Sequence, residues 1–284
     1  MSVDHYENFP VASVLCPPAL RPAVAAIYHF ARTADDLADE GEAPAEQRLD
    51  DLAAYRADLE AVVAGRPASA RWAPVFAALR AALHQHALPS ALLADLLSAF
   101  EQDVVKQRYA DRPELLDYCR RSANPIGRLL LHLYGVDDAT SLRQSDSICT
   151  ALQLANFWQD LGVDARRGRL YVPATDSIRH GVSPDQLLAC NDSPAVHALV
   201  AELVDWTYDL MGTGAPLSMA IPGRAGWELR LVVQGGLRIL EKTRQIGCST
   251  LLQRPKLRAY DVPLLLWRAV WMRDGVVAAQ RRSA

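Results

Sequence analysis

The sequence predicts an all-α protein with a single domain, residues 1–284, built as a helical bundle. Apolar residues recur at helical spacing along most of the chain, whereas alternating strand patterns and βαβ units are absent. No Pro-, Gly- or Ser-rich linker divides the chain. Half of the residues are hydrophobic, which is ample for one large core.

Nine helical segments are expected from these periods and their start signals. The first begins at Leu20, with Pro22 in its first turn, and Pro44 begins the second. The segments cover about 20–42, 44–63, 71–86, 89–109, 113–134, 140–163, 195–219, 224–245 and 261–280. The stretch 168–184 contains Gly, Pro and Ser, so we expect a loop there with a short helical piece.

A proline interrupts the fifth expected helix. Pro125 should kink it, and Gly127 just beyond would allow a ligand or a neighbouring helix to approach closely. Arg121 and Asn124 flank this kink and are candidate substrate-binding residues. For Arg121 a surface salt bridge is the alternative role.

Composition excludes several classes of function. The net charge of −3 gives no basic footprint for nucleic acid. The five cysteines never form a Cys-x-x-Cys pair, which argues against a disulfide framework or a zinc site and favours reduced thiols in the cytoplasm. The first residues do not resemble a secretory signal, and no apolar run approaches a membrane span. Peripheral membrane contact stays open.

The first expected helix carries a stripe of carboxylates. Asp35 and Asp39 are four residues apart, which places them on one helical face, where like charges repel unless a cation lies between them. Arg32 could bind phosphate oxygens or pair with Asp36 one turn later. Tyr28, one turn further back, could donate to a diphosphate, although core packing is favoured. An acidic stretch alone is often only a solvated helix face.

A second polar stripe lies far along the chain. Gln153, Asn156, Asp160 and Asp164 fall at i, i+3, i+7 and i+11, and apolar residues surround them. Such a stripe is typical of a buried pocket. Oxygen ligands without Cys or His suit Mg²⁺, which binds a few carboxylates together with substrate phosphates. Two stripes facing one pocket would hold a diphosphate through several Mg²⁺ ions.

Longer runs around both stripes resemble the squalene/phytoene synthase family of head-to-head prenyl diphosphate synthases. The first matching run is Phe30-Ala31-Arg32-x-x-Asp35-Asp36-x-x-Asp39. The second, with the flap that follows it, is Gln153-Leu154-x-Asn156-x-x-x-Asp160-x-x-x-Asp164-x-x-x-Gly168-Arg169-x-Tyr171-x-Pro173. The resemblance extends over about residues 9–256 and implies a class I isoprenoid synthase fold with a central pocket.

Within that family, residues 5–13, 118–128 and 156–160 resemble the bacterial hydroxysqualene synthases of the hopanoid pathway. The resemblance implies an enzyme, a carbon–oxygen lyase or prenyl synthase, that ionises presqualene diphosphate and captures the rearranged cation with water. It also implies functional coupling to a presqualene diphosphate synthase and to a flavin-dependent reductase. Several Mg²⁺ ions are expected, and NADPH is not, because no dinucleotide fingerprint is present.

The resemblance and the stripes together assign roles to individual residues. The expected metal ligands are Asp35, Asp36, Asp39, Asn156, Asp160 and Asp164. Arg32 joins them as a catalytic residue that stabilises the leaving diphosphate, and Asn156 or Gln159 is expected to hold the attacking water. The expected substrate-binding residues are Phe9, Tyr28, Phe30, Arg121, Asn124, Gln153, Phe157, Trp158 and Tyr171.

One departure from the family pattern bears on the product. Gly236 stands where many condensing members carry Tyr, so we expect the missing phenol to leave room for a water. Two alternatives remain open. One is a complete head-to-head synthase making phytoene, dehydrosqualene or squalene; the other is a noncatalytic helical assembly factor, which would have no need for stacked carboxylates.

Overall fold

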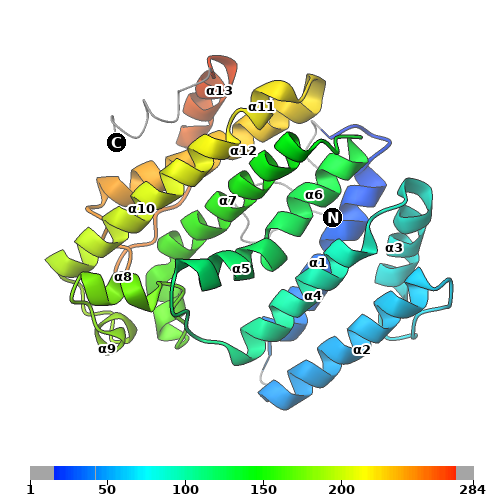
Figure 1. Cartoon of the computed structure of the whole chain (residues 1–284), viewed down its shortest axis with the longest axis horizontal. Helices are drawn as coiled ribbons and strands as arrows, with labels where there is room; N and C mark the ends of the chain where they lie inside the picture. Colours follow the sequence, from blue (N-terminus) through cyan, green and yellow to red (C-terminus); the bar gives the residue numbers. More distant parts are fainter. Residues whose placement is uncertain (1–15, 42, 273–284) are drawn as a thin grey trace.

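The computed structural model describes residues 16–41 and 43–272. In chain order the helices are α1 (Arg21–Asp39), α2 (Ala45–Val63), α3 (Ala73–His86), α4 (Ser90–Val105), α5 (Arg112–Ser122), α6 (Asn124–Leu133), α7 (Ala139–Arg166), α8 (Ala174–Arg179), α9 (Pro184–Leu188), α10 (Pro194–Gly214), α11 (Leu217–Ala220), α12 (Gly223–Gln245), η1 (Ala259–Asp261) and α13 (Val262–Val270) (Figure 1). In this part of the chain the only strand-like pairing is an isolated bridge between Arg108 and Leu170. The predicted all-α fold class is confirmed.

Four of the expected helices end earlier than expected or break. The helix expected over 261–280 ends at Val270, and Trp271 already lies in a turn. The expected kinked helix 113–134 is two helices, because Pro125 begins α6 after a break at Ala123. The expected helix 195–219 likewise breaks before Pro216 into α10 and α11. The α4 helix ends at Val105, and Lys106 is already extended.

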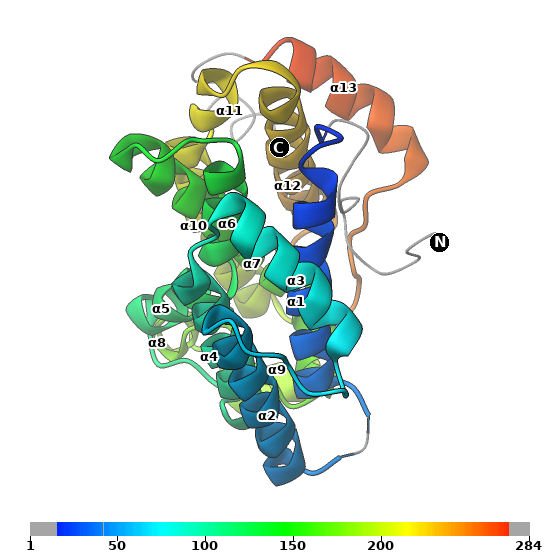
Figure 2. The same ribbon diagram turned by 90° about the vertical axis from the view of Figure 1, so that its right-hand side faces the viewer.

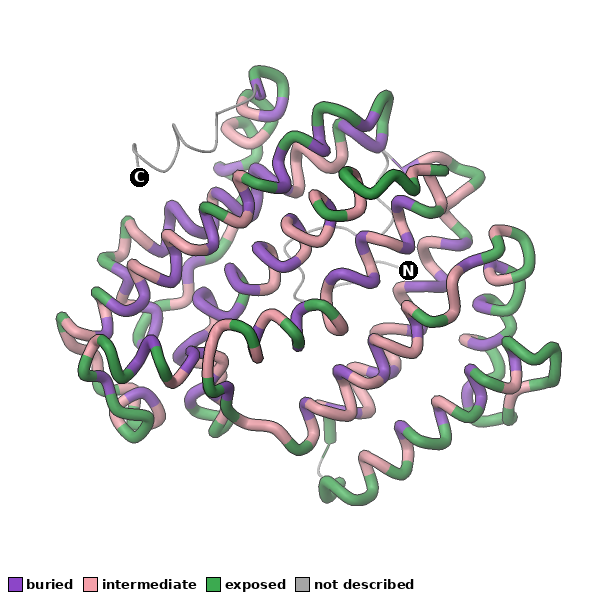
Figure 3. The backbone as a smooth tube through the Cα atoms, viewed as in Figure 1, coloured by how far each residue is buried: buried purple, intermediate pink, exposed green. Residues whose placement is uncertain are grey.

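The buried residues form two neighbouring clusters. One lies between α1, α2, α3 and α4, and the other surrounds α7, which packs against α6, α10 and α12 in the middle of the molecule (Figures 1 and 2). Buried positions recur along one face of most helices, as the purple segments in Figure 3 show. The expected helical periodicity of the core is therefore confirmed.

Close helix approach around α7 depends on small residues. A Cβ atom on Gly127 of α6 would lie only 2.5 Å from Cys149 Sγ on α7. The close approach expected at this glycine is thus present, and its neighbour is a helix. All five cysteines are free thiols. None of the described helices combines the length and apolar character needed to cross a membrane.

Candidate active site

The first carboxylate stripe lies on α1, opposite the face that this helix buries in the core. Pro22 fits the first turn because it has no amide hydrogen to leave unpaired. Arg32 holds the stripe together: its guanidinium lies 3.0 Å from Asp35 Oδ2, 2.7 Å from Asp36 Oδ1 and 2.9 Å from Glu40 Oε1. The salt bridge to Asp36 that the sequence allowed is therefore formed.

The second stripe lies on the C-terminal half of α7, where the segment after α12 covers it. Arg254 donates to both carboxylate oxygens of Asp160, through Nε and, at 2.8 Å, through Nη2. The buried amide of Gln159 donates to the Pro255 carbonyl oxygen at 2.6 Å. Gly162 lets the segment after α12 lie directly on α7. Its amide donates to the Thr250 carbonyl oxygen, and a Cβ atom at position 162 would collide with the Leu251 backbone.

A glycine-dependent turn at the end of α7 brings the two stripes together. Gly168 has φ of +80°, a left-handed conformation that ends helices, and the Arg169 amide donates back to the Asp164 carbonyl oxygen at 2.9 Å. The Leu170 amide then bonds to Gln107 after α4. This turn directs the Arg169 guanidinium to Asp39 on α1, which it binds through two hydrogen bonds of 2.8 and 2.6 Å.

The pKa of Asp164 responds to charges on both stripes, so the two stripes lie close together. Burial is the main cause that raises the pKa of the Asp164 carboxyl to about 7. The negative charges of Asp160 on the same helix and of Asp39 on α1 raise it further, while Arg169 and Arg167 oppose them. Asp39 and Asp164 are 125 residues apart in sequence, yet they share one electrostatic environment.

A further carboxylate, Asp103 on α4, lies in the same environment. It accepts a hydrogen bond of 2.7 Å from the Tyr118 hydroxyl, and its Oδ1 is buried without a hydrogen-bond partner. Burial raises the pKa of Asp103 to about 7, with smaller contributions from Asp39 and Asp35. Asp103 was not predicted from the sequence, because it belongs to neither stripe. A buried carboxylate facing two others is a natural site for added positive charge.

The donor set fits divalent cations, although its carboxylates are held by arginines in this structure. Among the described residues, no group of three or more His, Cys, Asp or Glu side chains is close enough to hold one ion. The reason is visible in the ion pairs, since Arg32, Arg169 and Arg254 each bind a carboxylate of the two stripes. Aspartate oxygens without Cys or His nearby remain the ligand chemistry that Mg²⁺ prefers.

Aromatic side chains form a wall beside these carboxylates. Phe157 and Tyr171 stack face to face, with ring centroids 3.8 Å apart and planes 4° from parallel. Tyr118 lies within 6.1 Å of both rings, and Tyr109 lies 5.7 Å from Tyr171. The Tyr118 hydroxyl links this wall to Asp103. The structure therefore brings the predicted residues Phe157 and Tyr171 together and adds two tyrosines.

Two aromatic residues that were expected to bind substrate lie in the core. Phe30 is fully buried on the other face of α1, where its ring stacks on Tyr55 with centroids 5.2 Å apart. Trp158 is also fully buried, and its indole donates to Thr207 Oγ1 on α10 at 2.8 Å. Each residue is adjacent in sequence to site residues but points to the opposite side of its helix, away from the carboxylate stripe.

The remaining predicted residues are distributed around this region. Gln153 is half-buried and Asn156 exposed on α7, Tyr28 is half-buried on α1, and Phe9 lies outside the described residues. Asn124 is buried and accepts from Thr150 Oγ1 on α7 at 3.0 Å. The substrate-binding roles of Gln153, Tyr28, Phe9 and Asn124 therefore stay predictions.

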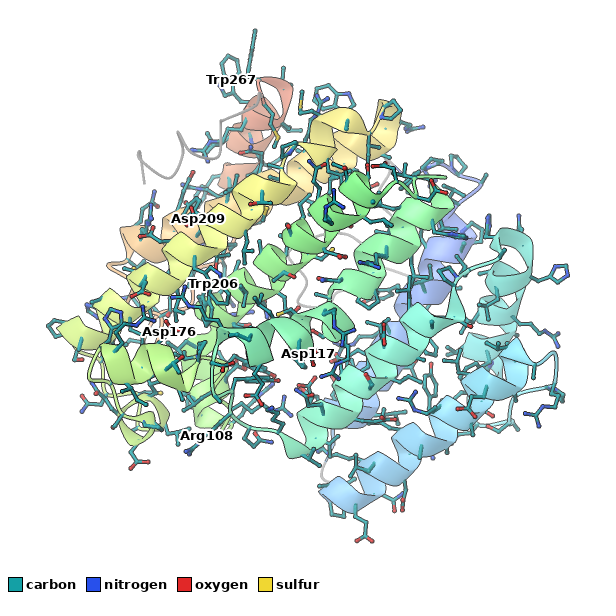
Figure 4. All side chains as sticks on the ribbon, viewed as in Figure 1. Arg108, Asp117, Asp176, Trp206, Asp209 and Trp267 are labelled. Atoms are coloured by element: carbon teal, nitrogen blue, oxygen red, sulfur yellow. The ribbon has the colours of Figure 1, made fainter. Side chains whose placement is uncertain are left out.

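Arg121 reaches the aromatic wall through an intermediate side chain. Its Nη2 donates to Gln102 Oε1 at 2.6 Å, and Gln102 donates to the Tyr109 hydroxyl at 3.2 Å. Arg121 also pairs with Asp117, an exposed residue of α5 that is labelled in Figure 4. It is therefore both a salt-bridging residue and a support for the wall.

The space expected at Gly236 is filled. A Cβ atom there would lie 2.7 Å from Leu152 Cδ2 on α7 and 3.0 Å from Met211 Cε on α10. The prediction that the missing phenol leaves room for a water is thus wrong. Gly236 instead allows α12 to pack closely against α7 and α10, and Leu152 and Met211 occupy the volume beside it.

An open pocket of about 380 Å³ lies at the outer side of the Arg169–Asp39 pair. Arg48, Arg167 and Gln107 also line it. Arg48 already binds the backbone, since it donates to the carbonyl oxygen of residue 38 in the last turn of α1 and to those of residues 41 and 43 just after it. This polar pocket therefore adjoins the ion pair that joins the two stripes.

Comparison with known proteins agrees with this geometry. The family model for squalene/phytoene synthase matches residues 3–261. A hydroxysqualene synthase of Rhodopseudomonas palustris is 37% identical over 228 residues, 80% of this chain and 75% of the relative. A phytoene synthase of Thermus thermophilus is 31% identical over 267 residues, 93% of this chain and 88% of the relative.

A solved structure supports the same relationship. The squalene synthase HpnC from Alicyclobacillus acidocaldarius superposes with a TM-score of 0.78 at 37% identity, covering 86% of this chain and 90% of that one. Sequence and fold agree over most of the chain. The protein therefore belongs to the squalene/phytoene synthase family, whose enzymes act on prenyl diphosphates.

Proposed function

We propose that this chain is a hydroxysqualene synthase of squalene and hopanoid biosynthesis, with residues 1–284 forming one domain. It would ionise presqualene diphosphate and capture the cation with water, giving hydroxysqualene and inorganic diphosphate. The observation that carries this proposal is the pairing of Arg169 with Asp39, because it joins two carboxylate stripes into one site. The relatives named hydroxysqualene synthase support the choice of substrate.

The residues of the two stripes would bind the diphosphate end of the substrate. We assign Mg²⁺ ions to Asp35, Asp36, Asp39, Asn156, Asp160 and Asp164; when bound, they would supply positive charge that offsets the charge developing on the leaving diphosphate. Arg32, Arg169 and Arg254 pair with these carboxylates, and we assign them to donate to diphosphate oxygens. The carbon–oxygen bond breaks, and its electron pair leaves with the diphosphate.

The aromatic wall would protect the cation while it rearranges. Phe157, Tyr171, Tyr118 and Tyr109 present ring faces and edges beside the carboxylates, and such faces stabilise cations while excluding water. Water then attacks through its oxygen and loses a proton. Gln159 is no longer a candidate for holding this water, because it is buried and its amide is bonded to Pro255. Asn156, exposed on α7, remains the candidate.

Product analysis tests the proposed function. Presqualene diphosphate and Mg²⁺ should give hydroxysqualene and diphosphate with or without NADPH, and in ¹⁸O-labelled water the label should appear in the product hydroxyl. A hydrocarbon product, or turnover only with NADPH, would show that the assignment is wrong. The same assay without protein measures spontaneous solvolysis of the substrate.

A complete head-to-head synthase is the second candidate. It is favoured by the phytoene synthase relative, which matches 93% of this chain. Incubation with farnesyl or geranylgeranyl diphosphate alone distinguishes the two, because only the complete synthase would condense two such molecules. A noncatalytic assembly factor would release no diphosphate from any prenyl substrate.

We place the enzyme in the cytoplasm, between two other reactions. Its substrate already contains two joined farnesyl units, so a presqualene diphosphate synthase must supply it. Its alcohol product needs two electrons to become squalene, which fits coupling to a flavin-dependent reductase. Peripheral membrane contact would suit such apolar intermediates.

A further inference from the structure

The flap, residues 168–173 between α7 and α8, carries two residues of the site without a helix of its own. Arg169 reaches Asp39 on α1, and Tyr171 stacks on Phe157 in the aromatic wall. A segment outside the helices has no helical hydrogen bonds to fix its course, so its backbone groups bond to neighbouring segments instead. The place of Arg169 and Tyr171 therefore depends on what holds the flap.

The flap lies beside the segment that follows α4. The Leu170 amide donates to the Gln107 carbonyl oxygen at 2.9 Å, and just beyond the flap the Ala174 amide donates to the Tyr109 carbonyl oxygen at 3.0 Å. Tyr109 is itself a wall residue, with its ring centroid 5.7 Å from that of Tyr171. The two tyrosines keep this spacing only while the two segments stay in register.

A buried ion pair ties the two segments together at the end of this register. Arg112, the first residue of α5, donates to both carboxylate oxygens of Asp176 on α8, through Nε at 3.1 Å and through Nη2 at 2.9 Å. Asp176 is only 1% exposed. Two bonds from one planar guanidinium fix orientation as well as distance. Arg112 follows Tyr109 closely along the chain, as Asp176 follows Tyr171, so the pair sets how the two wall residues face each other.

Helix α10 holds this pair from a third direction. Glu202 Oε1 accepts from Arg112 Nη2 at 2.7 Å and from Arg179 Nη1 at 2.6 Å, and Arg179 also pairs with Asp176. The Arg112 guanidinium lies 4.6 Å from the ring centroid of Trp206 (Figure 4). Two guanidiniums thus face two carboxylates. Removing the charge of the buried carboxylate would leave the arginines facing each other with too little negative charge between them.

We propose that Asp176 is a positioning residue: its pair with Arg112 holds the flap where Tyr171 completes the wall and Arg169 meets α1. It acts through the backbone of residues 171–175. The role rests on the proposed function, in which the wall keeps water from the cation. With the flap displaced, a water oxygen would bond to the cyclopropylcarbinyl cation before it rearranges and would then lose a proton, giving a cyclopropylcarbinyl alcohol.

Trypsin digestion without substrate measures whether the flap is held. The bond between Arg169 and Leu170 is protected in place, since Leu170 is only 4% exposed. Asp176→Asn should speed cleavage of this bond by about tenfold, because the flap would open locally more often. Asp146→Asn is the matched control: it weakens a pair that Arg128 makes with both carboxylate oxygens, at 2.9 and 2.6 Å, near the other end of α7. Equal acceleration at every cleavage site would leave Asp176 a general structural role and overturn the proposal.

Product analysis tests the consequence for catalysis. With presqualene diphosphate and Mg²⁺, Asp176→Asn should lower kcat by about 10- to 100-fold and should raise the share of cyclopropylcarbinyl alcohol relative to hydroxysqualene. Loss of folded protein would lower the rate but leave the product ratio unchanged, so an unchanged ratio would overturn the positioning role. If the wild type does not convert presqualene diphosphate, the proposed function is wrong, whereas the digestion still tests the flap.

A second variant keeps the test independent of the folding of Asp176→Asn. Arg112→Lys retains the positive charge but removes the planar fork that binds both carboxylate oxygens. It should speed cleavage after Arg169 and shift the product ratio in the same direction, by smaller factors. Wild-type cleavage together with a wild-type product ratio in this variant would overturn the proposal.

Discussion

At the scale of single residues, the site is a set of carboxylates held by arginines. Arg32, Arg169 and Arg254 come from α1, from the turn after α7 and from the segment after α12. Each provides donors that match carboxylate and phosphate oxygens equally well. Diphosphate and cations would therefore replace contacts that already exist, so the fold can hold this acidic site together without them.

Neutralising one carboxylate in either stripe should stop turnover. We expect Asp36→Asn and Asp160→Asn each to lower kcat by about 10²–10³-fold, because each removes one charge from the assembly that stabilises the leaving group. Circular dichroism should show unchanged helix content. Asp209→Asn is the control, since Asp209 is exposed on α10, away from the site (Figure 4). Near-normal rates in both site variants would exclude the assigned role.

Asp103 should make the metal-free protein less stable at high pH. In the unfolded chain its carboxyl loses its proton near pH 4, whereas burial keeps the folded pKa at about 7. The folded state therefore binds the extra proton between these values, and its stability falls as pH rises from about 4 to 7. Asp103→Asn should raise the free energy of unfolding by about 1–3 kcal/mol at pH 8 and by less at pH 5.

Thermal unfolding in EDTA at both pH values measures this effect. The side-chain oxygen of the asparagine can still accept the hydrogen bond from the Tyr118 hydroxyl, so the variant keeps this contact. Asp209→Asn controls for the change in net charge. If Asp103→Asn raised the free energy of unfolding equally at pH 5 and pH 8, the buried, protonated Asp103 carboxyl would be contradicted.

The sequence predicted the two carboxylate stripes and the Arg32–Asp36 pair, but it did not predict Asp103 or the arginines that reach the stripes from other segments. Spacing on one helix is visible in sequence, which is why both stripes could be read directly. The pairing of Asp160 with Arg254 spans 94 residues, and Asp103 belongs to a third helix, so no local pattern connects them. Phe30 and Trp158 were expected to bind substrate because they neighbour site residues in sequence, but neighbours on a helix do not share a face.

At the scale of elements, two glycines, one on α7 and one in the turn after it, determine which segments reach the site. Gly162 lets the segment after α12 lie on α7, and this contact places Arg254 beside Asp160. Gly168 reverses the chain so that Arg169 reaches α1. Both positions act through the backbone, and neither needs to touch the substrate.

Adding one methyl group at two buried helical glycines should have different consequences. At Gly162 the new Cβ would meet the Leu251 backbone, which has no alternative rotamer, whereas at Gly236 it would meet the ends of the Leu152 and Met211 side chains. We expect Gly162→Ala to lower stability by about 2–3 kcal/mol and to reduce activity, and Gly236→Ala to cost about 1 kcal/mol. Urea unfolding and diphosphate release measure both. Equal losses would argue against a backbone contact at Gly162.

The positions of the helices could be predicted from the sequence more accurately than the points at which they break. The 3.6-residue period located α1, α2, α3, α7 and α12 almost to their ends. Prolines at 125 and 216 were visible, but whether each kinks a helix or begins a new one depends on the helices packed against it. The packing at Gly236 also depended on two other helices, which is why the expected cavity was wrong.

At the scale of the whole molecule, α7 connects the core to the chemistry. Its N-terminal half packs against α6, α10 packs along it from Ile148 to Trp158, and its C-terminal half carries Asp160 and Asp164. The fold class followed from composition and period alone. How α1 and α7 approach each other follows from tertiary packing and from the Arg169–Asp39 pair, which no period encodes.

The central claim is that the two stripes form a single site. Calorimetric titration of inorganic diphosphate in the presence of Mg²⁺ tests it in the wild type, in Asp36→Asn, in Asp160→Asn and in the double variant. If one site uses both stripes, each single variant should lose most of the affinity, and the double variant should lose much less than the sum of the two free-energy changes. Two independent binding events in the wild type, one removed by each substitution, would contradict the account.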